Sequence, residues 1–77
     1  MTEFDNLKRS YISAIQWGLT ARVGYNESKQ GNEVLHKFCE NLIENSDYND
    51  SNKMTMKHEL KIIKEALSKE IESLYRK

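Results

Sequence analysis

The chain has 77 residues, and its twelve lysine and arginine residues are balanced by twelve aspartate and glutamate residues. A chain of this length forms one domain at most and buries only about 60% of the surface that its unfolded form exposes. Its single cysteine, Cys39, excludes an internal disulfide. We therefore expect the small core to be completed by a second copy of the chain or by a larger partner.

The balanced charge also bears on the class of partner. A sequence-independent nucleic-acid binder usually has a clear basic excess, and a mimic of nucleic acid needs a large acidic excess. This sequence has neither, so nucleic acid is a less favoured partner than protein. No apolar run approaches the roughly 20 residues that span a bilayer, and we expect no membrane insertion.

Two features suggest where the protein acts. The lone cysteine and the lack of a signal-peptide pattern favour the reducing cytoplasm. The abundance of asparagine, lysine, isoleucine and glutamate is typical of AT-rich coding sequence, which suggests a low-GC bacterium or its phage.

The first predicted helix covers residues 2–23. Thr2 and Asp5 form an approximate capping box at its start. One side of this helix is apolar and carries Phe4, Leu7, Tyr11, Ile12, Ala14, Ile15 and Leu19. The glycine-flanked polar segment from Gly24 to Gly31 predicts a connection to the next helix.

The second predicted helix covers residues 32–46, with Asn32 as its N-cap. Its apolar face predicts a buried stripe, with His36 on the opposite, solvent-facing side; the stripe comprises Val34, Leu35, Phe38, Cys39, Leu42 and Ile43. The very polar segment from Ser46 to Lys53 predicts a loop, and Ser51, Asn52 and Thr55 are candidates to cap the helix that follows it.

The third predicted helix, residues 54–76, has the clearest pattern in the chain. Its apolar residues recur every three or four positions, the period of a straight α-helix: Met56, Leu60, Ile63, Leu67, Ile71 and Leu74. The predicted fold is therefore all-α. We expect a single domain, residues 1–77, formed as a small three-helix bundle or as a helical hairpin plus one helix, and completed by oligomerisation.

The sequence offers little reactive chemistry. His36 and Cys39 lie three positions apart, and His58 is the other soft metal ligand, whereas a structural zinc site needs four ligands. A catalytic Cys–His pair would also need an orienting third group and an oxyanion site. We therefore predict no enzyme activity, no metal and no cofactor. The basic strip on the third helix is interrupted by acidic residues and predicts a solvated face; it comprises Lys53, Lys57, Lys61 and Lys64.

One segment resembles the second helix-turn-helix of AraC-type transcription factors. The resemblance is carried by the run from Ala21 to Ser28, followed by Val34, Lys37 and Phe38, and it covers about 18 residues. It implies a dimeric DNA-binding regulator that uses Tyr25 to Phe38 as a helix-turn-helix, in which glycine makes the turn and the recognition helix follows. The sequence departs from the motif at four positions, Thr20, Lys29, Gln30 and Gly31, and its downstream spacing is one residue too long. We assign no family on this basis.

The function expected from these observations is a small non-enzymatic protein-interaction module. Such a regulator, inhibitor or immunity-type protein would bind one protein target through a helix face. The predicted partner-binding residues are Trp17, Tyr25, Leu60, Ile63, Leu67, Ile71 and Leu74. Two positions are open for Trp17. It is either exposed between small neighbours and available as an interface hot spot, or buried in a three-helix core that is wide enough to need it. The alternative functions are a dimeric helix-turn-helix regulator and a structural homo-oligomer.

Overall fold

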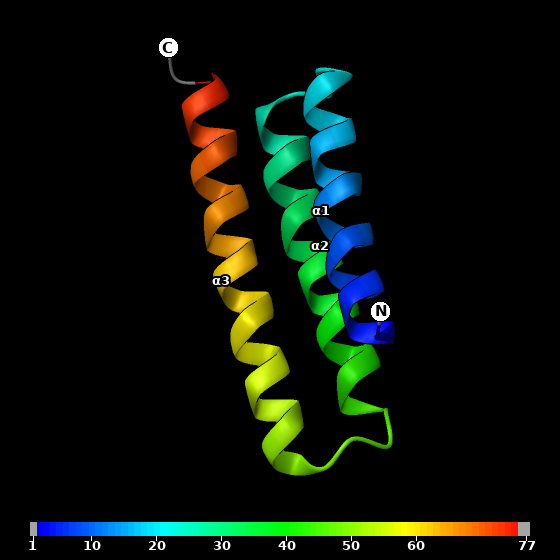
Figure 1. The fold of residues 1–77 in the computed structure, drawn as a ribbon. Coiled ribbons are helices and arrows are strands. Elements are labelled where there is room, and N and C mark those ends of the chain that lie inside the picture. Colours follow the sequence, from blue (N-terminus) through cyan, green and yellow to red (C-terminus); the bar gives the residue numbers. More distant parts are fainter. Residues whose placement is uncertain (1, 76–77) are drawn as a thin grey trace.

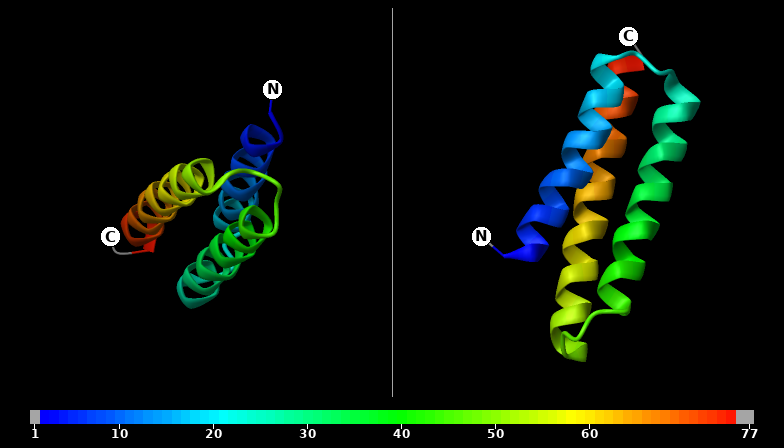
Figure 2. Two further views of the ribbon diagram at one scale, coloured as in Figure 1. Left: turned by 90° about the horizontal axis from the view of Figure 1, so that it is seen from below. Right: turned by 90° about the vertical axis from the view of Figure 1, so that its right-hand side faces the viewer.

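The computed structural model describes residues 2–75 and shows three helices, α1 (Glu3–Thr20), α2 (Tyr25–Glu44) and α3 (Asp50–Tyr75). The helices run alternately up and down along one long axis, so that each is antiparallel to the next in the chain (Figure 1). The end-on and side views show α3 covering one side of the α1–α2 hairpin (Figure 2). The prediction of a small all-α bundle is confirmed.

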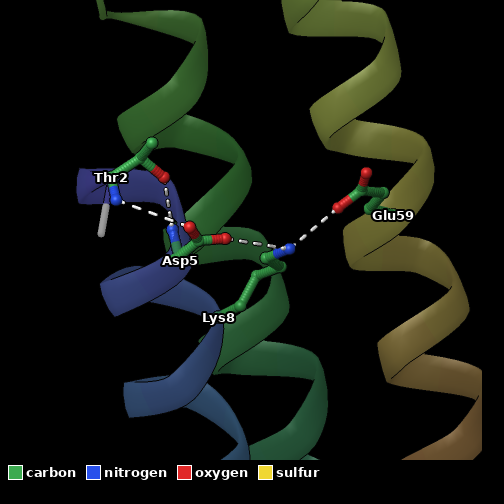
Figure 3. Close-up of polar contacts among 4 residues, drawn as sticks. All are labelled: Thr2, Asp5, Lys8 and Glu59. Carbon is green, nitrogen blue, oxygen red and sulfur yellow. Dashed lines mark hydrogen bonds and ion pairs between the residues drawn. The ribbon is translucent and has the colours of Figure 1, made fainter.

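The predicted capping box at the start of α1 is present (Figure 3). The Thr2 hydroxyl accepts a hydrogen bond from the backbone N–H of Asp5 at 3.1 Å, and the Asp5 carboxylate accepts one from the Thr2 N–H at 3.4 Å. These two bonds satisfy donors that a helix start leaves unpaired. Hydrogen bonding of the Asp5 carboxylate to the side chain and the backbone of Thr2 lowers the pKa of Asp5. The same carboxylate lies 3.5 Å from Lys8 Nζ, which in turn lies 3.0 Å from Glu59 on α3.

The connection between α1 and α2 is shorter than predicted. The helix α1 ends at Thr20, and α2 begins at Tyr25 instead of residue 32. The chain reverses through Arg22 and Gly24, whose φ angles are +57° and +111°, and glycine adopts such an angle without steric penalty. The segment up to Gly31 that was expected as a turn is helical, with Ser28 buried and Tyr25 and Gly31 half-buried against the bundle. Such packing overrides local propensity.

The second loop is also shorter than predicted, since α3 begins at Asp50 instead of residue 54. The side chain of Asn49 accepts a hydrogen bond from the backbone N–H of Asn52 at 2.8 Å. This is the geometry of an N-cap, so Asn49 caps α3 and the predicted caps at Ser51, Asn52 and Thr55 are wrong. The predicted end of this helix at residue 76 lies outside the described residues.

The core runs along the centre of the bundle and is small. Tyr11, Ile15 and Leu19 reach it from α1, and the other buried hydrophobic residues are Cys39, Ile43, Leu60, Leu67 and Ile71. Partly buried side chains such as Phe4, Leu7 and Ile63 pack against this group. The apolar stripe of the third helix therefore faces the core, as its period indicates.

Candidate functional site

The predicted partner-binding residues of α3 are mostly core residues. Leu60 and Ile71 have no exposed surface, Leu67 is 4% exposed, and Ile63 is half-buried. A side chain in the core cannot contact a partner of the folded bundle, so these residues hold the helices together instead. Leu74 is 42% exposed at the end of the stripe.

Tyr25 closes the end of the bundle. Its hydroxyl donates a hydrogen bond to Glu72, and its ring packs edge-on against Tyr75 with 6.0 Å between the ring centroids. The Tyr75 hydroxyl accepts a hydrogen bond from the backbone N–H of Gly24 at 3.2 Å. These contacts fasten the α1–α2 turn to the last turn of α3, which gives Tyr25 a structural role whether or not it also touches a partner.

Trp17 is on the surface. Its exposed fraction is 76%, and its neighbours on the same side, Ala14 on α1 and Ala21 directly after its end, are exposed as well. The alternative in which Trp17 fills the core is therefore wrong. These small neighbours cover little of the indole, and tryptophan is enriched among the residues that dominate binding interfaces.

The helix α2 is rotated relative to the prediction. It turns Ser28, Asn32 and His36 inward together with Cys39 and Ile43. Three residues of the predicted buried face lie outside instead: Val34 is 59% exposed, Phe38 56% and Leu42 46%. We call these three residues the α2 stripe. The predicted solvent-facing position of His36 and the predicted N-cap role of Asn32 are wrong.

A longer second helix would have pointed to this rotation. Tyr25, Ser28, Asn32, His36 and Cys39 recur every three or four residues and share one face when the helix begins at Tyr25. When the helix is started at Asn32, Tyr25 and Ser28 are lost from this face. The apolar residues then form the more regular stripe and are predicted to face the interior. The α2 stripe was therefore not among the predicted site residues.

A shallow apolar groove adjoins one end of the α2 stripe. It has a volume of about 240 Å³ and lies between the start of α1 and the end of α2. Its apolar lining includes Phe4, Leu7 and Leu42, and Tyr48 closes it from the following loop.

Asn32 is the centre of a buried polar network. It is 1% exposed, and its side-chain oxygen accepts a hydrogen bond from the Tyr11 hydroxyl. Its amide nitrogen donates to the carbonyl oxygen of Lys64 at 3.0 Å and to the Ser68 hydroxyl at 3.1 Å. One side chain thus joins all three helices, and burial raises the pKa of the Tyr11 hydroxyl.

The candidate reactive groups are enclosed. Cys39 is 2% exposed, and burial raises the pKa of its thiol, the opposite of what activates a cysteine. His36 is 9% exposed, its Nε2 is buried with no hydrogen-bond partner, and its Nδ1 lies 3.6 Å from Glu40. Burial lowers the pKa of His36. Within residues 2–75, no three His, Cys, Asp or Glu side chains gather where they could hold a metal ion.

The basic strip of α3 is partly neutralised by α2. Lys57 forms an ion pair with Glu44, and Lys53 donates a hydrogen bond to the carbonyl oxygen of Glu44 at 2.9 Å. A groove of about 570 Å³ further along combines Lys61 and Lys64 with Glu40 and Glu65. Its mixed charge makes no continuous basic surface.

The helix pair α1–α2 does not have the geometry that the helix-turn-helix resemblance implies. The two helices lie side by side and antiparallel in Figures 1 and 2. The helices of a DNA-binding helix-turn-helix cross at about 90–120°. The residues of the implied recognition helix also include Ser28, Asn32 and His36, which face the interior.

Comparisons of this chain with protein-family models, with curated proteins and with solved structures give no match. Among the helices of residues 2–75, none combines the length and the apolar character needed to cross a membrane.

Proposed function

We propose that this protein is a small non-enzymatic interaction module, a regulator, inhibitor or immunity-type protein that binds one protein target through a helix face. The observation that carries the proposal is Trp17, a large aromatic side chain left 76% exposed between Ala14 and Ala21. Exposing this much of an indole to water is unfavourable, and binding of a partner over it recovers that free energy.

The enclosed state of the reactive groups agrees with a binding function. A nucleophile or general base has to reach its substrate, whereas Cys39 and His36 face the core. A buried free thiol also suits a reducing compartment, and we propose the cytoplasm of a bacterium as the place of action, with the gene bacterial or phage-encoded.

The target contact is proposed at the second half of α1, with Trp17 as its anchor. Tryptophan is enriched among the few interface residues that carry most of the binding free energy. The nearby Val23 is 48% exposed and extends the apolar surface toward the α1–α2 turn.

The test is a pull-down from a bacterial lysate with the tagged protein, with and without nuclease, read by mass spectrometry. We expect one stoichiometric protein that survives nuclease and whose capture falls about 30-fold or more with Trp17→Ala. Met54→Ala is the matched control, because Met54 is 74% exposed on α3 and its truncation should leave capture unchanged.

Two results would contradict the proposal. Capture that is unchanged by Trp17→Ala would show that the anchor is elsewhere. Capture that disappears with nuclease and weakens steeply with added salt would favour the DNA-binding alternative, because contacts to several phosphates release counterions.

A further inference from the structure

The helix α2 has its polar and apolar sides in an unusual arrangement. Ser28, Asn32 and His36 face the interior, while the α2 stripe, Val34, Phe38 and Leu42, faces outward. Amphipathic helices of a closed bundle place the apolar side inward. The helices α1 and α3 cover only the inner face of α2. Its outer apolar face remains exposed to water.

We propose that a second copy of this chain covers the α2 stripe, forming a two-fold symmetric dimer in which α2 packs antiparallel against α2 of the other copy. This interface is separate from the proposed target contact at Trp17. Ile15 on α1 lies beside Gly31, so Trp17 is on the order of 10 Å or more from Phe38 along the bundle.

The spacing of the stripe is self-complementary. Its three residues follow one another every four positions over about 12 Å of helix, with Phe38 in the middle. When two such helices cross antiparallel at Phe38, each Val34 lies opposite Leu42 of the other copy and the two phenylalanines meet on the axis. An isologous interface requires this kind of pairing, in which one patch matches itself.

The charges on α2 also favour a second copy. Beside the three stripe residues, the exposed Asn41 and Asn45 are uncharged, and the charged residue on this side, Glu27, lies two turns before Val34 and so outside the crossing. Glu33, Lys37 and Glu44 are set off to another side of the helix. Identical charged faces would place like charges opposite each other, and this face avoids that repulsion. It also lacks the charge pattern by which an acidic or basic partner would be selected.

The shape of this side also suits a second copy. The groove of about 240 Å³ beside Leu42, lined by Phe4 and Leu7, offers a hollow for an apolar side chain of the other copy. Each copy thus supplies both protruding side chains and a depression.

The first test is sedimentation equilibrium of the whole chain from micromolar to millimolar concentration. We expect a monomer–dimer equilibrium whose dissociation constant rises about 30-fold or more with Phe38→Asp. Ile62→Asp is the control, because Ile62 is 53% exposed on α3 and its substitution should leave the equilibrium unchanged. Circular dichroism checks that both variants keep the helical content of the wild type.

The second test looks for a new covalent dimer instead of the loss of a non-covalent one. We expect Phe38→Cys to form a disulfide-linked dimer on mild oxidation, because residues on the two-fold axis meet at the short Cα separation that a disulfide requires. The wild type, whose Cys39 is buried, and Ile62→Cys should stay unlinked.

Three results would overturn the proposal. They are a wild type that stays monomeric up to millimolar concentration, a dimer that Phe38→Asp leaves intact, and a Phe38→Cys variant that links no better than Ile62→Cys. A monomeric wild type that needs Phe38 to bind another protein would assign the stripe to that protein. Because none of these measurements involves Trp17, the dimer and the proposed target contact can fail independently.

Discussion

At the scale of single residues, Asn32 has the largest structural consequence. Its side chain contacts Tyr11 on α1 and both Lys64 and Ser68 on α3. Apolar side chains pack against one another in many relative positions, whereas these hydrogen bonds form in only one. The network therefore fixes how far each helix is shifted along its neighbours, the role that buried polar residues have in some coiled coils.

Replacing Asn32 by alanine should destabilise the protein by about 1–3 kcal/mol, because it removes the hydrogen bonds that this buried side chain forms with Tyr11, Lys64 and Ser68. Urea denaturation followed by circular dichroism measures the change. Asn41→Ala is the control on an exposed position of the same helix, with an expected change within about 0.5 kcal/mol. Equal effects of the two substitutions would show that the network contributes nothing.

His36 gives the protein a pH-dependent stability. Burial lowers its pKa below the value of 6.5 that it has when unfolded, with Glu40 acting in the opposite direction and Lys64 in the same direction. The unfolded chain therefore takes up the proton first as the pH falls. The free energy of unfolding should be highest above pH 6.5 and should decrease as the pH falls from there through the lower pKa of the folded state.

The measurement is the free energy of unfolding of the wild type and of His36→Gln from about pH 7 to about pH 5. The variant should lose less stability over this range than the wild type, and His58→Gln, at an exposed position, should behave as the wild type does. Asp5 and Glu44, whose pKa values are lowered, affect stability at more acidic pH than this. Parallel curves for the wild type and His36→Gln would exclude His36 as the cause.

At the scale of the elements, two glycines have opposite roles. Gly24 lies in the turn with a φ of +111°, and a Cβ there would also collide with the Glu27 side chain. Gly31 lies inside α2, and a Cβ there would make ordinary contact, 4.0 Å from Ile15. The turn needs its glycine, whereas the helix only tolerates one.

Replacement by alanine should therefore change stability in opposite directions. Gly31→Ala should stabilise the protein by about 0.5–1 kcal/mol, because it removes the entropic disadvantage of glycine in a helix. Gly24→Ala should destabilise it by about 1–3 kcal/mol, because alanine is strained at this backbone angle. Thermal or urea denaturation measures both, and a common sign would contradict this assignment of roles.

Local sequence patterns predict some helix boundaries correctly and others not. Thr2 and Asp5 cap α1 as predicted, because a capping box involves only neighbouring residues. The segment from Gly24 to Gly31 was predicted as a connection on local propensity, and α2 nevertheless begins at Tyr25. Its helical state depends on contacts with α1 and α3, such as those of Tyr25 with Glu72 and Tyr75, which no local pattern reveals.

At the scale of the whole molecule, the bundle combines a small core with large exposed apolar side chains. Eight hydrophobic residues are buried within residues 2–75, while Trp17, Phe38 and Met54 are each more than half exposed. A small domain gains limited stability from such a core. Covering its exposed apolar side chains would add further stability, in proportion to the apolar area that is buried. We propose two separate contacts on these faces, the α2 stripe for a second copy and the Trp17 surface for a target.

The all-α class, the three helices and the inward stripe of α3 follow from local sequence patterns, because apolar residues that recur every three or four positions form one face of an α-helix. The side of α2 that faces inward depends on how the three helices pack together. Two adjacent stripes, one through Asn32 and Cys39 and one through Phe38 and Leu42, are both compatible with the periodicity. The choice rests on hydrogen bonds between Asn32 and residues distant in sequence, and it leaves Val34, Phe38 and Leu42 exposed on α2.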